Sequence, residues 1–205
     1  MKELSILKEN FKAIHTHIEN VCIDGEETLR VLKADKIMQF DENTYAKVND
    51  LCFHNGIIEV DMKANLLPDA PDFARGFIGI IFRANDNDSK FECFYVRPTN
   101  GKSCNDPIRR SHGCQYFSYP GYTFAYFREF GIEGYEAEVS DIDLNEWIHL
   151  KAEIEGECAK FYINDDEQPR LVVENMIHGD SQGSIGFFSE IGTDAYFKNL
   201  KVELK

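Results

Sequence analysis

The sequence predicts an all-β protein in which two antiparallel sheets pack face to face as a sandwich, preceded by a short amino-terminal helix. Three observations lead to this fold class. Segments rich in β-branched and aromatic residues recur along the 205 residues, separated by turn-forming Gly, Asn, Asp and Pro. No long helical pattern comes between them. The chain carries 16 Phe, 9 Tyr and 1 Trp, so each sheet must cover a large apolar face with another sheet.

The amino-terminal segment departs from the strand pattern. Leu4, Leu7, Phe11 and Ile14 recur at helical spacing, which predicts an amphipathic helix over residues 2–12 within a helical extension covering residues 1–19. Beyond it, strands are expected because β-branched and aromatic runs stand between turn formers. The expected strands lie at residues 28–34, 44–50, 56–64, 76–84, 90–98, 114–120, 147–156, 158–165, 170–176, 183–190 and 195–205.

The connections between these strands indicate the domain organisation. The Asn and Asp residues within 84–89 and the pair Gly156-Glu157 predict hairpin turns. No linker rich in Gly, Ser or Pro and no internal repeat divides the sequence, so residues 1–205 are expected to form a single domain. The segments at about 99–113 and 121–134 carry no strand pattern, and long loops in a sandwich are often functional.

The charge and cysteine content bear on partners and compartment. The chain has 22 Lys and Arg against 36 Asp and Glu, a net charge of −14, which argues against binding to nucleic acid or to an anionic membrane. Its first residues lack the apolar run of a signal peptide or membrane span, so a cytoplasmic location is expected; homo-oligomerisation stays open. The six cysteines form no Cys-x-x-Cys pair and are expected to be mostly buried thiols, with Cys104 and Cys114 considered for a local disulfide.

A series of short motifs recurs in a recognisable order over residues 20–205. The motifs are F-H-N-G-I-I-E-V-D-M-K, G-F-I-G-I-I-F-R-A-N-D, F-E-C-F-Y-V-R-P, Q-Y, G-Y-E-A, E-W-I-H-L-K-A-E-I-E-G-E-C-A-K-F-Y-I-N, G-S-I-G-F-F and A-Y-F-K-N-L-K-V. In this order the chain resembles the concanavalin A-like lectin/glucanase superfamily, above all its laminin-G-like and keto-disaccharide-hydrolase-like bacterial branches. The resemblance implies a jelly-roll sandwich of two curved antiparallel sheets, with sugars bound on the concave face or its rim loops. A shared fold does not by itself establish a function.

Glu59 and Asp61 are the candidate catalytic residues. Residues i and i+2 of a strand lie on one face, about 6.6–6.8 Å apart at the backbone, a spacing compatible with a glycosidase carboxylate pair. Laminarinase-type relatives carry Glu-x-Asp-x-Glu here, but Lys63 occupies the third position in this chain. A lysine would keep the neighbouring carboxylates ionised, the opposite of what a general acid requires. The structural alternative is a solvated strand face with ion pairs to His149 and Lys151.

A second group of polar and aromatic residues is a candidate ligand groove. Guanidinium, amide and phenol groups suit the hydroxyls and C–H faces of sugars, and arginines in strands need acidic partners or a polar surface. The alternation places Arg97 on one face with Tyr95, and Arg83 with Ile81 and Gly79. The alternative is that the arginines pair with Glu92, Asp86 or Asp106 and tie loops together. The expected ligand-binding residues are Arg83, Tyr95, Arg97, His112, Gln115 and Tyr116.

These patterns lead to three function classes. The leading interpretation is a lectin-like module that binds a neutral or basic saccharide. The runner-up is a glycosidase-like hydrolase that uses Glu59 and Asp61, and the third is a laminin-G-type domain that binds proteins through its rim loops.

Metal ions and other cofactors are not expected. Asp86-Asn87-Asp88 and Asp141-Ile142-Asp143 offer oxygen ligands but lack EF-hand spacing, so they are interpreted as turn acids, with Ca²⁺ as a minor alternative. Trp147 opens a strand and is expected to pack against the protein rather than stack on a sugar.

Overall fold

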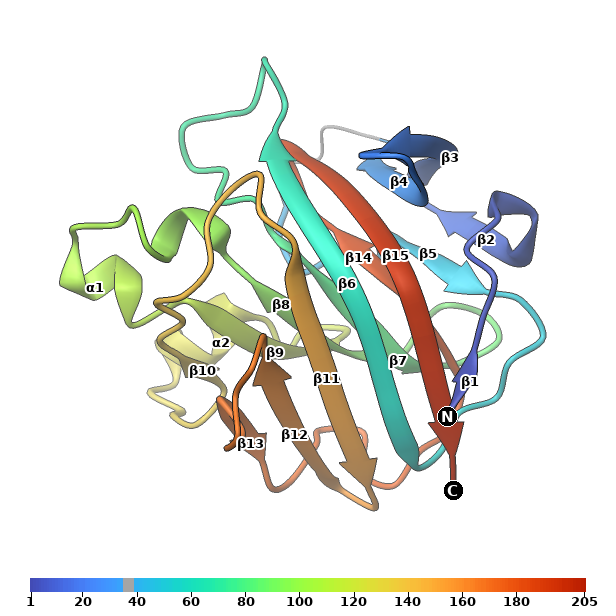
Figure 1. The fold of residues 1–205 in the computed structure, drawn as a ribbon. Helices are drawn as coiled ribbons and strands as arrows, with labels where there is room; N and C mark the ends of the chain where they lie inside the picture. Colours follow the sequence, from blue (N-terminus) through green and yellow to red (C-terminus); the bar gives the residue numbers. More distant parts are fainter. Residues whose placement is uncertain (35–38) are drawn as a thin grey trace.

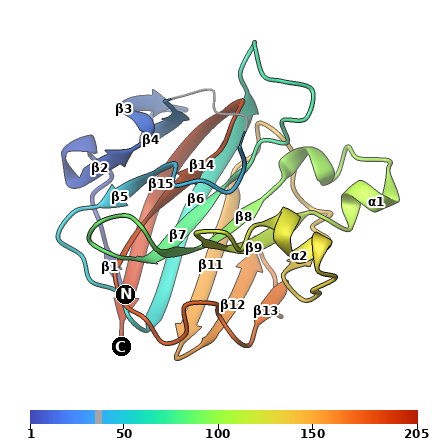
Figure 2. The same cartoon turned by 180° about the vertical axis from the view of Figure 1, so that it is seen from behind.

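Two antiparallel sheets packed face to face make up the protein, as seen in a computed structural model that describes residues 1–34 and 39–205 (Figures 1 and 2). Sheet A contains, in spatial order, β13 (Leu171–Val173), β12 (Cys158–Ile163), β11 (Ile148–Glu155), β6 (Gly56–Leu66), β15 (Thr193–Leu204), β4 (Glu26–Lys33) and β3 (Thr16–Ile23), and β1 (Lys2–Glu3) also pairs with β15. Sheet B contains β10 (Glu136–Ala137), β9 (Cys114–Tyr119), β8 (Phe91–Val96), β7 (Ile78–Ala84), β14 (Ser184–Ser189), β5 (Tyr45–Val48) and β2 (Phe11–Ile14). The two-sheet antiparallel sandwich predicted from the sequence is confirmed.

The main core lies between the two sheets. On β6, Ile58, Val60 and Met62 are fully buried, while the residues between them face outward and are half-buried, as the strand alternation predicts. Stacked rings join the sheets: the centroids of Phe94 and Phe161 lie 4.1 Å apart. Such contacts between inner faces fix the position of one sheet on the other.

The predicted amino-terminal helix is wrong. Residues 2–14 form β1, a single 3-10 turn η1 (Lys8–Asn10) and β2. The apolar residues serve strand contacts: the Leu4 amide donates to the Leu200 carbonyl at 2.9 Å, and Phe11 stacks on Phe187 at 5.2 Å. Pairing with β15 and β5 therefore overrides the local helical spacing.

Sheet B is apolar on both faces. Its outer face carries the buried rings of Tyr45, Phe91, Tyr95, Phe117 and Phe188. The loops before β5 and β7 cover part of this face, together with α2 (Phe124–Glu129), and the ring of Phe40 contacts those of Phe73, Phe77 and Phe124. The two remaining helical elements are η2 (Pro98–Asn100) and α1 (Pro107–Arg110). The outer face of sheet B is therefore a second hydrophobic layer over much of its area.

All six cysteines are free, so the disulfide considered for Cys104 and Cys114 is not formed. Burial raises the pKa of the Cys114 thiol to about 12, which keeps it protonated at neutral pH. Within residues 1–34 and 39–205, no helix has the length and apolar character needed to cross a bilayer.

Candidate functional site

The expected ligand residues of the strands divide between the two faces of sheet B. Tyr95, Arg97 and Gln115 lie together on the outer face, whereas Arg83 and Tyr116 lie on the face toward sheet A. The prediction that Arg83 shares a face with Ile81 and Gly79 is wrong. Two residues of β7 oppose one residue of β14 at this point, and Arg83 has φ +54°, so a β-bulge turns its side chain.

Arg83 ties together three segments at the end of the sandwich. Its side chain is 0% exposed, and its Nε and Nη1 donate to the carbonyls of His54 (2.9 Å) and Gly179 (2.8 Å). Its Nη2 donates to Asn55 Oδ1 at 3.0 Å and lies 3.4 Å from Asp180. The guanidinium is thus committed to the protein itself, mostly to carbonyls rather than to the acidic residues that the alternative interpretation named.

Tyr116 is equally committed to internal contacts. Its hydroxyl donates to Glu92 Oε2 at 2.7 Å and accepts the Ile177 amide at 2.9 Å. The other Glu92 oxygen accepts the His178 amide at 2.9 Å. Both side chains are fully buried, so they anchor the segment before β14 rather than face solvent.

Arg97 connects the residues on the outer face. Its Nη1 donates to the His112 carbonyl at 2.9 Å, and its Nη2 donates to the Tyr95 hydroxyl at 3.0 Å and to Gln115 Oε1 at 3.3 Å. The Gln115 amide in turn donates to the Tyr135 carbonyl at 3.0 Å. Arg97 is only 5% exposed, so this network supports the surface from beneath.

A covering layer separates Arg97 from solvent. Its guanidinium lies 5.9 Å from the ring centroid of Phe124 and 6.0 Å from that of Phe77. Beside it, Asp41 is 2% exposed and accepts the Phe124 amide at 2.7 Å. Burial raises the pKa of Asp41 to about 6, against the opposing hydrogen bond from Phe124 and the charge of Arg97.

Next to this network an open hollow of about 320 Å³ lies between α2 and the β9–β10 edge of sheet B. The carboxylate of Glu136 lies in its wall, with Oε2 2.8 Å from His112 Nδ1 and 3.0 Å from Arg128 Nη2. These side chains are 26%, 28% and 43% exposed. The full lining is Ser111, His112, Gln115, Phe124, Phe127, Arg128, Gly131, Ile132, Glu133, Gly134, Tyr135 and Glu136.

Aromatic rings form the apolar wall of the hollow. Phe127 and Tyr135 stack with centroids 4.3 Å apart, and the Arg128 guanidinium lies 5.1 Å from the Phe124 ring centroid. α2 presents the rings of Phe124 and Phe127, and Thr123 caps its first turn by accepting the Tyr126 amide through its side chain. The hollow therefore combines hydrogen-bonding groups of both signs with ring faces.

The expected residues contribute to this hollow only in part. His112 and Gln115 line it, and Arg97 and Tyr95 lie behind Gln115. Sequence reasoning missed Arg128 and Glu136. Glu136 lies on a strand of two residues that no periodicity reveals, although it falls within the G-Y-E-A motif, whose place in the order was recognised.

Glu59 and Asp61 lie elsewhere, on the outer face of sheet A. Asp61 Oδ1 is 2.7 Å from His149 Nδ1, and its Oδ2 accepts the Asn199 amide at 2.7 Å. Burial alone would raise the pKa of Asp61, but the hydrogen bonds from His149 and Asn199 outweigh it and lower the pKa. The ion pair expected with His149 is confirmed, whereas the Lys151 ammonium contacts Glu153 at 2.6 Å.

This arrangement makes a prediction for the imidazole of His149. The hydrogen bond that His149 donates to Asp61 raises the pKa of His149 above its ordinary value of 6.5, against the opposing effect of burial. In Asp61→Asn we expect the pKa of His149 to fall toward that ordinary value, measured by NMR titration of its ring protons. An unchanged His149 titration in the variant would contradict the assignment of this pair.

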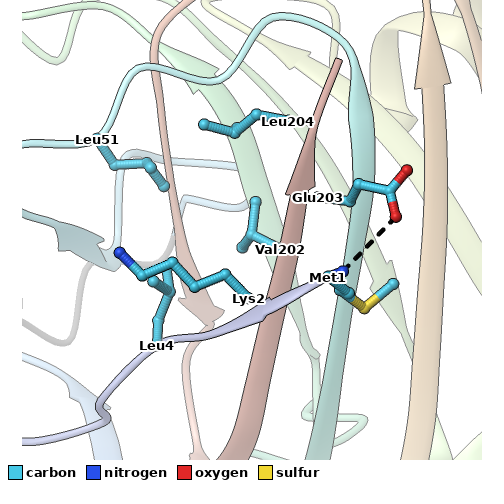
Figure 3. Close-up of a pocket in the computed structure, with 7 residues that line it drawn as sticks. All are labelled: Met1, Lys2, Leu4, Leu51, Val202, Glu203 and Leu204. Atoms are coloured by element: carbon cyan, nitrogen blue, oxygen red, sulfur yellow. Dashed lines mark ion pairs between the residues drawn. The ribbon is translucent and has the colours of Figure 1, made fainter.

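Two further hollows have linings less suited to a sugar. One hollow of about 700 Å³ on sheet A is lined by Trp147 among others. The Trp147 ring centroid lies 4.2 Å from Lys198 Nζ and 5.7 Å from Lys63 Nζ, so lysine side chains already cover the indole ring. Figure 3 shows a groove of about 460 Å³ beside the chain ends, where the Met1 amino group lies 3.9 Å from Glu203. Its lining is mostly aliphatic and contains no aromatic ring.

The turn acids considered for calcium have protein partners. Asp88 accepts Lys12 Nζ at 3.0 Å, the Tyr45 hydroxyl at 3.0 Å and the Lys47 ammonium. Asp141 lies 3.4 Å from Arg170. In the described part of the chain no group of three His, Cys, Asp or Glu residues is arranged to hold a metal ion.

Comparison with known proteins identifies the fold. No protein-family model and no curated protein matches the chain. Among solved structures, the carbohydrate-binding module CBM66 from Bacillus subtilis is 16% identical, with a TM-score of 0.57 over 93% of this chain and 96% of that one. A protein with a galectin-like fold from Bacillus subtilis is 13% identical, with a TM-score of 0.54 over 95% of this chain and 89% of that one. A glycosyl-hydrolase candidate from Parabacteroides distasonis is 12% identical, with a TM-score of 0.54 over 95% and 99%.

The chain therefore shares the two-sheet β-sandwich fold of these structures, in agreement with the jelly-roll sandwich that the resemblance predicted. At these identities the likeness concerns the fold alone. The laminin-G-like and keto-disaccharide-hydrolase-like branches stay predictions.

Proposed function

We propose that this protein is a carbohydrate-binding module that takes a saccharide into the hollow between α2 and the β9–β10 edge. The observation that supports it most is the carboxylate of Glu136 held between Arg128 and His112 beside the rings of Phe124 and Phe127. A carboxylate accepts hydrogen bonds from sugar hydroxyls, and guanidinium and imidazole groups donate to their oxygens. The half-buried ring of Phe124 offers apolar surface to the C–H face of a sugar, while the buried ring of Phe127 supports the wall behind it.

The network beneath the hollow supports the same role. Arg97 holds the backbone at His112 and the side chain of Gln115, and Gln115 holds the segment that leads into Glu136. Both walls of the hollow are thereby fixed before a ligand arrives, which reduces the entropy lost on binding. The likeness in fold to a carbohydrate-binding module is consistent with this function.

Hydrolysis by Glu59 and Asp61 is less well supported. The two carboxylates lie on the outer face of sheet A, while the hollow belongs to sheet B. The hydrogen bonds that lower the pKa of Asp61 favour a permanently ionised group, which is unsuitable as a general acid at neutral pH.

Screening on a glycan array, followed by calorimetric titration with the best ligand, tests the binding function. We expect Arg128→Ala to weaken binding by about tenfold or more, because a hydrogen bond to a charged group contributes about 1.5–3 kcal/mol. Arg110→Ala is the matched control: Arg110 is 37% exposed and pairs with Glu138 at 2.9 Å, but it does not line the hollow. The affinity of the Arg110→Ala variant for the glycan should equal that of the wild type. An array without any bound glycan, or equal losses in the two variants, would refute the proposal.

A further inference from the structure

A row of aromatic rings leads away from the hollow along α2. The ring centroids of Tyr122 and Tyr126 lie 5.1 Å apart, and those of Tyr126 and Phe130 lie 4.7 Å apart. We call these three residues the α2 ring ladder. Tyr122 is 37% exposed and Phe130 is 61% exposed, which is unusual for large aromatic side chains on a folded protein.

The ladder is continuous with the hollow. The Tyr126 ring lies 5.8 Å from that of Phe127, which lines the hollow, and the chain after Phe130 returns along the hollow's wall. There Ile132, 40% exposed, also lines the hollow. Eight large apolar side chains are exposed among the described residues, and three of them fall between residues 122 and 132. This clustering indicates an interaction surface rather than scattered exposure.

The surroundings of the ladder favour a sugar chain as its occupant. Each ring contacts the next in turn, with tilts of 70° and 44° between them, so the three rings form a single row. Charged side chains border it, because Arg128 and Glu129 are exposed on the same short helix and Glu133 follows. A narrow aromatic strip with a polar border suits an amphipathic chain lying along it better than a protein face, which needs a wider apolar centre.

The charges around the site restrict the ligand further. Glu136 pairs with Arg128 at 3.0 Å, Glu133 also lines the hollow and Glu129 is exposed on α2, in a chain whose net charge is −14. These carboxylates would repel a uronate or sulfate group, whereas an uncharged sugar chain would not be repelled.

We infer that the ligand is a neutral oligosaccharide, with one sugar unit in the hollow and the following units on the α2 ring ladder. This inference rests on the proposed function, because it extends the same site. The hollow supplies the hydrogen bonds and the ladder supplies apolar contact. Affinity therefore grows with chain length until the ladder is covered.

Titration with sugars of increasing length tests the inference. The probes are neutral gluco-, galacto- and manno-oligosaccharides, their monosaccharides, and oligogalacturonates as the anionic comparison. For the wild type we expect affinity to rise from monosaccharide to oligosaccharide, and oligogalacturonates to bind more weakly than neutral chains. Phe130→Ala should bind the monosaccharide normally and lose about three- to tenfold in affinity for the oligosaccharide, the contribution typical of one aromatic contact.

Two control variants keep the outcomes distinct. Ile108→Ala removes a 73% exposed apolar side chain from α1 and should leave binding of every length unchanged. Arg128→Ala should weaken binding of every length. If the wild type binds sugars but Phe130→Ala matches it at all lengths, or if affinity is independent of length, the ladder is refuted and the saccharide function stands. If only the oligogalacturonates bind, the neutral ligand is refuted and the saccharide function stands. If no sugar binds at all, both proposals are refuted.

Discussion

Replacing Arg83 with methionine is expected to lower the free energy of unfolding by about 3–5 kcal/mol, the cost typical of breaking a buried charged network. Methionine fills much of the volume of the aliphatic stem but donates no hydrogen bond. The carbonyls of His54 and Gly179 would lose their guanidinium donors in a place where Arg83 itself is 0% exposed. An unsatisfied buried acceptor costs about 1–3 kcal/mol, so these two part-buried carbonyls contribute a share of the effect and the lost packing and the lost contact with Asn55 contribute the rest.

Urea denaturation measures this loss, and titration of the remaining folded protein measures saccharide affinity, which we expect to be unchanged. Arg83→Lys is the conservative comparison, because it retains the charge but not the planar fork of donors, and it should have intermediate stability. A variant with normal stability and abolished binding would instead return Arg83 to the ligand site, where sequence reasoning had placed it.

Asp41→Asn is expected to stabilise the protein at pH 8 by up to about 3 kcal/mol, a shift of about two pKa units at 1.36 kcal/mol each. Burial raises the pKa of Asp41 from 3.8 to about 6 in the folded protein. Between these two values the folded protein holds a proton that the unfolded chain has released. Stability from this group is therefore fully present below pH 3.8 and is lost as pH rises through 6. Asparagine keeps an acceptor for the Phe124 amide and cannot ionise.

Unfolding free energies of both proteins at pH 5 and pH 8 test this prediction. The difference between variant and wild type should grow toward pH 8. Glu190, whose pKa burial raises to about 7, has the same sign of pH dependence and leaves a residual slope in both proteins. Parallel stability profiles for the two proteins would show that Asp41 does not titrate in this range.

The sequence predicts the sandwich well because burial alternates with a period of two wherever one strand face is wet. In β6, for example, alternation correctly places Ile58, Val60 and Met62 on the inward face. It fails at residues 2–12, where Leu4 and Phe11 fit a helical spacing equally well. Their true partners lie on β15 and β14, almost the length of the chain away.

The candidate site divides in a similar way. Alternation and pairing were enough to bring Tyr95, Arg97 and Gln115 together, because these lie on adjacent regular strands. A single bulge moved Arg83 to the other face. Glu136 and Arg128 escaped detection because the path of the segment between β9 and β10 depends on tertiary packing rather than on a local period.

Pairing of β1 with β15 has a practical consequence for binding studies. Lys2 lies opposite Val202, so both ends of the chain lie at one corner of the molecule, while α2 lies on the far side in both views (Figures 1 and 2). The hollow beside α2 therefore lies away from both ends. An affinity handle or sensor surface coupled through either end would leave the proposed binding site pointing outward, and the orientation would be the same whichever end is chosen.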